Sequence, residues 1–265
     1  MGIDGISAHP AGDRRNLHHL TGRQPVALRF MRLPLVIFDA DNALWATEKL
    51  YDEALARTQT VVERAGIDGK TWRRRQREID LDAAKKEGFS IERFPSSSLR
   101  AYRELALTPK REVEQSVYAA SRSVFEAKAD LMPEAAEVLS YLHPSYNLAL
   151  LTKGERTVQH RRVSDSGLVS FFDVVAIVER KLPSSFESIC TLLEVAPEEA
   201  VSIGNSIRSD IVPAVKAGLR TLWVDAYVWE HERHAEQGLP RGAIRLGGLA
   251  EVPSAVSKLL PSTLA

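Results

Sequence analysis

Short runs of apolar residues, each followed by polar residues, recur along this chain. The first run, Leu35-Val36-Ile37-Phe38, stops at Asp39, and similar runs follow at 147–151, 174–178, 200–203 and 221–224, with a shorter candidate at 243–246. A continuous apolar run of this length is typical of a strand that is buried on both faces, as in a parallel sheet. Helical patterns fill the segments between the later runs. The alternation predicts an α/β fold with a doubly wound, mostly parallel sheet.

The region between the first two apolar runs has a different pattern. It is rich in Ala, Leu, Glu and Arg, and helices are predicted at 48–65, 71–87 and 109–127. In the first of these, apolar positions recur at spacings of three and four, as an amphipathic helix requires. The stretch 88–98 is interpreted as a loop. We therefore expect an all-helical domain at 49–131, inserted into an α/β core formed by 31–48 and 132–265.

The N-terminal segment, residues 1–30, has no apolar stretch suitable for a signal peptide. Its arginines outnumber its acidic residues, a feature of transit peptides. We expect a disordered extension, or a start codon placed too early, in preference to a transit peptide. The fold is then expected to begin near Arg32.

Charge and composition narrow the possible functions. Lysine plus arginine and aspartate plus glutamate number 35 each, so the formal net charge is zero, and nothing in the overall charge favours nucleic acid or an anionic membrane as a partner. No apolar run approaches the ~18 residues of a membrane span. The single cysteine, Cys190, fits a reducing compartment and is expected to be a small buried hydrophobe. These features predict a cytoplasmic protein, either a monomer or a homodimer.

Polar residues that could take part in catalysis or ligand binding lie at the ends of four predicted strands. Asp39, Thr152, Lys181 and Asn205 each lie at, or just past, the end of a different apolar run. Ligands of open α/β sheets bind beyond the carboxyl ends of the strands, so these side chains are expected to converge on one site. Each residue alone has an ordinary explanation as a turn, a helix cap or a surface charge. Their recurrence at successive strand ends favours a catalytic site.

Asp39 and Asp41 form a carboxylate pair at the first of these strand ends. One carboxylate can attack phosphorus and form an aspartyl-phosphate, while the other protonates the leaving oxygen and later takes a proton from water. An anion that attacks a phosphate needs nearby cations. Mg²⁺, held by Asp39, the Asp41 carbonyl and the loop at 204–210, would supply that charge together with Lys181.

These residues resemble the sequence motifs of the haloacid dehalogenase-like (HAD) hydrolase superfamily over about 33–48 and 131–250. Asp39-Ala40-Asp41 is similar to its D-x-D motif, and Gly204 through Asp210 is similar to its G-D-S-x-x-x-D motif. The resemblance implies a Rossmann-like core with a helical cap between the first and second motifs. It also implies site roles: Asp39 and Asp41 as catalytic residues; Thr152, Lys153 and Lys181 as phosphate-binding residues; Asp39, Asp41, Asn205 and Asp210 around Mg²⁺.

Two features separate this chain from relatives within the superfamily. Asp41 favours phosphate chemistry, since the 2-haloacid dehalogenases lack the second aspartate and need no metal. Asn205 stands where the family usually has an acid, so one negative charge is missing from the metal site. We therefore expect Asp210 to make much of the remaining anionic contact with the metal.

The function predicted from these features is the Mg²⁺-dependent hydrolysis of a small phosphomonoester metabolite. A phosphosugar mutase of the same superfamily, or a binding or regulatory module with an impaired metal site, remains an alternative. The cap is expected to select the leaving group. Candidate selecting residues are Arg93, Arg100 and Tyr102 in and after the 88–98 stretch, although that stretch could equally be an ordinary connector.

Overall fold

The computed structural model describes residues 6–8, 33–87, 90–225 and 238–260. These residues form two compact units. The first, here called the core unit, contains the chain up to Trp45, the segment Leu131–Lys153 and everything from Ser166 onward. The second, the helical unit, contains Ala46–Asp130 together with Gly154–Asp165.

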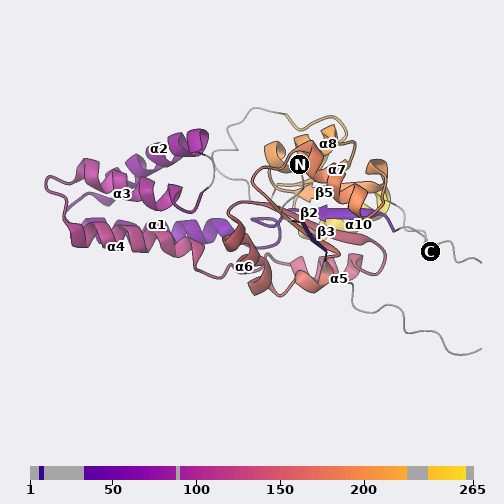
Figure 1. The fold of residues 1–265 in the computed structure, drawn as a ribbon, viewed down its shortest axis with the longest axis horizontal. Coiled ribbons are helices and arrows are strands. Elements are labelled where there is room, and N and C mark those ends of the chain that lie inside the picture. Colours follow the sequence, from indigo (N-terminus) through magenta and orange to yellow (C-terminus); the bar gives the residue numbers. More distant parts are fainter. Residues whose placement is uncertain (1–5, 9–32, 88–89, 226–237, 261–265) are drawn as a thin grey trace, which may run out of the picture. The chain divides into compact units, whose positions relative to one another are not determined.

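A seven-stranded sheet organises the core unit (Figure 1). Its strand order is β1-β4-β3-β2-β5-β6-β7. The strands are β1 (Ile6–Ala8), β2 (Leu35–Phe38), β3 (Asn147–Lys153), β4 (Val174–Val178), β5 (Ala200–Gly204), β6 (Arg220–Val224) and β7 (Ile244–Leu246). All neighbouring strands are parallel except β1, which pairs antiparallel with β4. The predicted α/β class with a doubly wound, mostly parallel sheet is confirmed.

Strand β2 occupies the position on which the site depends. All four of its residues are buried, and it pairs with β3 on one side and with β5 on the other. Phe38 lies level with Leu150 and Ile203, so the three strands reach the same edge of the sheet together. The chain winds outward from β2 in both directions, which makes this edge the topological switch point where ligands of such sheets bind.

Helices cover the two faces of this sheet because successive strand residues point to opposite sides. The helices of the core unit are α5 (Ala135–Leu142), α7 (Pro183–Leu192), α8 (Val212–Lys216) and α10 (Val252–Leu259). On one face Leu35 and Ile37 pack in one apolar cluster with Phe186 and Ile189 of α7. Cys190 belongs to the same cluster, and burial raises the pKa of its thiol to about 11, as expected for a packing residue.

The helical unit contains four main helices with an apolar interior. They are α1 (Thr47–Arg64), α2 (Gly69–Glu87), α3 (Arg93–Leu105) and α4 (Arg111–Arg122), followed by the 3-10 turn η1 (Ser123–Phe125). Most of α6 (Arg156–Ser166) also belongs to this unit. Trp72, Tyr102 and Val117 are buried together where the helices meet. No helix among the described residues is both long and apolar enough to cross a membrane.

Helix α3 corrects one sequence-based prediction. The stretch 88–98 was expected to be a loop, yet a helix begins at Arg93. Three consecutive serines made the segment look irregular. In the structure Ser97 and Ser98 are buried, and their hydroxyls donate to the carbonyls of Arg93 and Phe94 one turn earlier, at 2.8 and 2.9 Å. A serine satisfied in this way can continue a helix that tertiary packing stabilises.

Strand β1 corrects a second prediction. Residues 1–30 were expected to lie outside the fold, but Ile6–Ala8 pair with Val174–Ala176 at the edge of the sheet. A three-residue strand leaves almost no periodic signal, and the partner edge that stabilises it is about 170 residues away in sequence. The rest of that N-terminal segment lies outside the described residues.

Candidate active site

The strand ends bring the predicted polar residues together at one edge of the core unit's sheet. Asp39 follows β2 directly, and its backbone N–H donates to the Ile203 carbonyl at 2.8 Å, which prolongs the pairing with β5. Thr152 lies in β3 and Asn205 follows β5, on either side of it. Lys181 comes after β4, the next strand outward. The four residues thus come from strand ends at the same edge of the sheet, where Asp39 and Lys181 are in direct contact.

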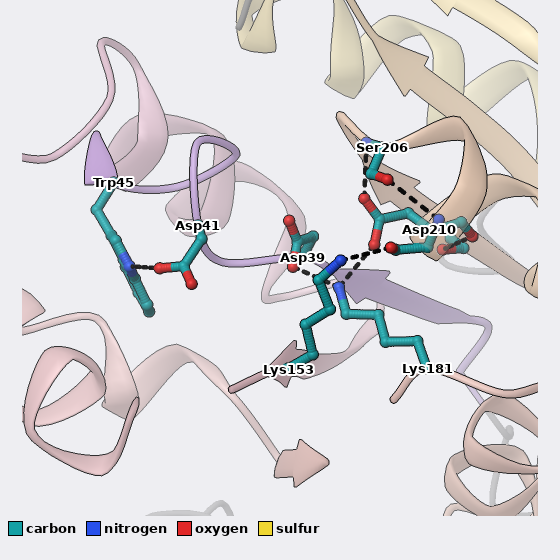
Figure 2. A network of polar contacts seen from close by, with 9 residues as sticks. Asp39, Asp41, Trp45, Lys153, Lys181, Ser206 and Asp210 are labelled. Carbon is teal, nitrogen blue, oxygen red and sulfur yellow. Dashed lines mark hydrogen bonds and ion pairs between the residues drawn. The ribbon is translucent and has the colours of Figure 1, made fainter. Parts of the chain in front are cut away.

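Lys181 bridges two buried carboxylates (Figure 2). Its Nζ forms ion pairs with Asp39 and with Asp210, the latter at 2.7 Å. The three side chains are at most 9% exposed. A buried charge is tolerated only when it is paired, so each of these three groups depends on the others.

The charges in this cluster do not balance. Burial, reinforced by the charge of Asp210 and opposed by Lys181, raises the pKa of Asp39 to about 7 from its ordinary value of 3.8. Burial also opposes the charged form of Lys181, but Asp210 and Asp39 outweigh it and raise the pKa of the ammonium group. Lys181 is thus positively charged, and its single charge is shared by the carboxylates of Asp39 and Asp210. A further positive charge next to Asp39 would offset this excess of negative charge.

The loop after β5 holds Asp210 in place. A π-helical turn, η4 (Ile207–Ile211), follows β5 and leads into α8. Asp210 Oδ2 accepts from the Ser206 backbone N–H at 2.9 Å, while its other oxygen accepts from Lys181. A Cβ on Gly204 would collide with the Asp210 side chain, so only glycine allows this close approach.

Two serines of this loop are site residues that the sequence-based interpretation did not single out. Ser206 Oγ accepts from the Ser209 backbone N–H at 3.1 Å, as a helix N-cap does. Ser209 Oγ accepts from Lys153 Nζ at 2.6 Å, which ties the end of β3 to the loop after β5. The three-residue spacing of the two serines was the only signal available, since the contact with Lys153 is tertiary.

Thr152 has an unused hydroxyl. The side chain is fully buried in β3, and its Oγ1 has no hydrogen-bond partner among the described residues. An unpaired buried hydroxyl is costly, and in native structures it calls for an explanation. A phosphate oxygen would provide the missing partner.

Asn205 follows β5 directly and is buried, and the turn that contains Asp210 comes next along the chain. Its backbone carbonyl accepts from the indole Nε1 of Trp223 at 2.9 Å. Arg245 lies over the Trp223 ring, 5.4 Å from its centroid, and forms an ion pair with Asp225. The backbone around Asn205 is therefore fixed from the neighbouring strands.

Asp41 is the second carboxylate of the predicted pair. It follows β2 by three residues, and its Oδ1 accepts from the indole Nε1 of Trp45 at 2.9 Å. Figure 2 shows its carboxylate directed toward that indole, while the Asp39 carboxylate is directed toward Lys181. The two carboxylates thus have different partners.

The three candidate selecting residues lie in the helical unit with defined contacts. Arg93 is buried at the start of α3 and forms an ion pair with Asp80, so its charge is used inside the unit. Tyr102 is buried, accepts from the Lys110 backbone N–H at 3.1 Å, and lines a hollow of about 590 Å³. Arg100 is exposed and pairs with Glu104 at 2.9 Å. The loop position expected for Arg93 is corrected, because packing against α2 makes it part of a helix.

The donor set of the core unit suits a hard divalent cation. Asp39 and Asp210 supply two carboxylates, and Asn205 lies on the same loop as Asp210. No group of three or more His, Cys, Asp or Glu side chains lies together as a metal site within the described ranges. Mg²⁺ needs only one or two carboxylates, because waters and substrate phosphate complete its octahedron. The imbalance of charge at Asp39 fits such a cation.

Comparison with known proteins agrees with this geometry. A model of the haloacid dehalogenase-like hydrolase family matches residues 33–218. The chain belongs to this family. The resemblance seen in the D-x-D and G-D-S-x-x-x-D positions is thereby confirmed.

Relatives and solved structures extend the comparison. Human N-acylneuraminate-9-phosphatase is 29% identical over 121 residues, which are 43% of this chain and 49% of that protein, so the chain spans about half its length. A haloacid dehalogenase-like family hydrolase from Xanthomonas campestris shares the fold with a TM-score of 0.72 at 21% identity, covering 86% of this chain and 96% of that chain. The HAD-hydrolase YfnB from Bacillus subtilis, bound to magnesium, has a TM-score of 0.62 at 18% identity, covering 85% and 99%.

The bridging lysine generates a prediction about stability. Lys181→Met should lower the free energy of unfolding by about 3–5 kcal/mol near neutral pH, because it leaves two buried carboxylates facing each other without a counter-charge. Urea unfolding followed by circular dichroism measures the loss. Lys110→Met is the matched control, because it makes the same change at an exposed lysine whose ammonium has no ion pair among the described residues. An equal effect of both variants would contradict the prediction.

Proposed function

We propose that this protein is a Mg²⁺-dependent phosphatase that hydrolyses a phosphomonoester of a small metabolite through an aspartyl-phosphate on Asp39. One observation carries the proposal. Lys181 holds Asp39 and Asp210 together in a buried cluster, and the hydroxyl of Thr152, which has no partner among the described residues, lies at the end of β3 between β2 and β4. A nucleophile, a fixed cation and a free donor for a phosphate oxygen thus occupy adjacent strand ends.

In the first step Asp39 is the nucleophile. A carboxylate oxygen of Asp39 attacks phosphorus, and the bond between phosphorus and the ester oxygen breaks. Asp41 gives its proton to the departing oxygen, so the alcohol leaves neutral. Lys181 and Lys153 offer positive charge to the phosphoryl oxygens, and Thr152 Oγ1 donates to one of them.

In the second step Asp41 acts in the opposite direction. It takes a proton from a water molecule, whose oxygen attacks the phosphorus of the acyl phosphate. The bond between phosphorus and Asp39 then breaks, which releases inorganic phosphate and restores Asp39 as a carboxylate and Asp41 as a protonated acid. The same residue can do both jobs because it leaves the first step deprotonated.

Asp39, the carbonyl of Asp41, Asn205 and Asp210 would hold Mg²⁺. When bound, the ion offsets the repulsion between the Asp39 carboxylate and the phosphate dianion. Support comes from the oxygen donors at this edge, from the raised pKa of Asp39, and from the magnesium in YfnB, which shares the fold. With Asn205 as a neutral ligand, Asp210 carries the anionic part of the loop's contribution.

The proposed substrates are small phosphorylated metabolites. Human N-acylneuraminate-9-phosphatase, by its name, acts on a phosphorylated sugar acid, and the likeness covers about half of that protein. A screen should therefore include acylneuraminate 9-phosphate beside sugar phosphates, nucleotides, phosphoglycolate and phosphoserine. The net charge is zero, so nothing in the overall charge favours nucleic acid or a membrane as a partner.

Loss of the nucleophile tests the reaction type. Asp39→Asn should abolish Mg²⁺-dependent phosphate release on every substrate found in the screen, because an amide cannot form the acyl phosphate. Phosphate release by a colorimetric assay, with and without EDTA, measures this. Phosphate release that persists in Asp39→Asn would exclude the mechanism. Transfer of the phosphoryl group between two positions of a sugar, without release of phosphate, would favour a mutase.

Removal of the Thr152 hydroxyl should affect phosphate binding without lowering stability. Thr152→Val should leave the free energy of unfolding unchanged or slightly higher, because no hydrogen bond within the described chain is lost. The same variant should weaken competitive inhibition by orthophosphate about ten-fold, the worth of one hydrogen bond to a charged group. Ser98→Ala, which removes a buried hydroxyl that does have a partner, should instead lower stability and leave inhibition unchanged. Unchanged inhibition in Thr152→Val would contradict the phosphate-binding role.

The uncharged Asn205 gives a prediction about the metal. Asn205→Asp should tighten Mg²⁺ binding on the order of ten-fold, since ligand charge tunes the affinity of such sites. It should also destabilise the metal-free protein, because a third carboxylate joins an already uncompensated cluster. Isothermal calorimetry measures the first effect and thermal unfolding in EDTA the second. If Mg²⁺ affinity does not change, Asn205 does not contact the metal.

A further inference from the structure

Trp45 lies at the end of the loop that carries Asp41. Its side chain is 1% exposed, and its indole Nε1 donates to Asp41 Oδ1 at 2.9 Å. This hydrogen bond to the Asp41 carboxylate comes from a large, rigid side chain. The turn itself does not require tryptophan at position 45, because a smaller apolar residue could fill it.

The backbone around Trp45 is fixed on both sides. Its carbonyl accepts from the Asn42 N–H at 2.7 Å and its own N–H donates to the Ala40 carbonyl at 3.2 Å, which closes the loop on itself. Trp45 also forms an antiparallel bridge with Leu131, and the Met132 N–H donates to the Leu44 carbonyl at 2.9 Å. Asn42 takes a left-handed conformation with φ of 60°, which the tight turn requires. The indole is therefore held in one place before any substrate binds.

A rigid donor selects the orientation of its acceptor. Two carboxylates two residues apart could both turn toward Lys181, the cation of the buried cluster. Figure 2 shows that they do not: Asp39 is directed to Lys181 and Asp41 to the indole of Trp45. An indole N–H donates only, so it can hold a carboxylate oxygen but cannot replace it as an acid or base.

From this geometry we infer that Trp45 is a positioning residue, which orients Asp41 for proton transfer to the leaving oxygen. The inference rests on the proposed phosphatase function and adds the residue that prepares its acid. When the bond between phosphorus and the ester oxygen breaks, the proton moves from Asp41 to that oxygen. Trp45 takes no part in the exchange of protons; it sets the direction from which the proton comes.

This role has a consequence that depends on the leaving group. An alkoxide is a poor leaving group and needs the proton as the bond breaks, whereas 4-nitrophenolate leaves readily without it. General acid catalysis contributes on the order of 10²–10⁴-fold where it is needed. Misplacing Asp41 should therefore slow the cleavage of alkyl phosphates much more than the cleavage of 4-nitrophenyl phosphate.

Trp45→Phe tests the inference, because it keeps an aromatic ring and removes the N–H. The kcat/KM, which covers the steps up to departure of the leaving group and not the later hydrolysis of the acyl phosphate, should fall about ten-fold or more for glycerol phosphate, or for the alkyl phosphate found in the screen, and less than about three-fold for 4-nitrophenyl phosphate. Trp72→Phe is the matched control: that indole is also fully buried, and it donates to the Ser98 carbonyl at 3.3 Å within the helical unit. It should leave the ratio of the two rates unchanged.

A double variant makes the test stricter. Asp41→Asn should produce the same dependence on the leaving group more strongly, and adding Trp45→Phe to it should cause no further selective loss, because the group being positioned is already gone. If Trp45→Phe does not fold, β-(3-benzothienyl)alanine at position 45 keeps the shape of the indole and replaces only the N–H.

The outcomes separate the two levels of the proposal. An equal loss on both substrates, no loss on either, or a selective loss that adds to that of Asp41→Asn would overturn the role of Trp45 and leave the phosphatase function standing. Persistent turnover in Asp39→Asn would overturn the phosphatase mechanism itself. A selective, non-additive loss on alkyl phosphates supports the inference.

Discussion

A single buried ammonium group joins the parts of this site that come from distant segments of the chain. Lys181 lies between Asp39 and Asp210, so the end of β4 is linked to the end of β2 and to the turn after β5. Neither carboxylate could remain buried without that cation, and the lysine could not remain buried without them. The arrangement holds Asp39 in position and leaves an excess of negative charge. That excess is the physical reason why the site would bind a second cation, and only with that cation in place would the site attract a phosphate group.

The sheet brings these segments together. Because β2 is central and fully buried, its C-terminal end has strands on both sides, and residues from four strands reach the same edge. The neighbouring segments are then tied by short polar contacts. Lys153 on β3 donates to Ser209, and Ser206 donates its backbone N–H to Asp210. The core unit therefore presents a prearranged site, which lowers the cost of organising charges at the moment of reaction.

The two aspartates that follow β2 illustrate how identical side chains acquire different chemistry. Asp39 is paired with a cation inside the sheet edge, while Asp41 is held by the neutral indole of Trp45. In the mechanism that we propose, these different partners suit the different tasks of nucleophile and proton carrier. In the helical unit, charged residues have a structural use: Arg93 is buried against Asp80 and holds α3 to α2. A charged residue in the sequence of the helical unit is thus weak evidence for a substrate contact.

The sequence alone determined the α/β class, the helical insert and the strand-end positions of Asp39, Thr152, Lys181 and Asn205, because apolar runs and the residues that end them are local signals. It could not determine α3, where serines are satisfied by the preceding turn, or β1, which exists only against the edge of β4. The lysine bridge, the serine contact of Lys153 and the hold of Trp45 on Asp41 were decided by the tertiary structure. Each of these contacts depends on distance and direction in space, and spacing along the chain records neither.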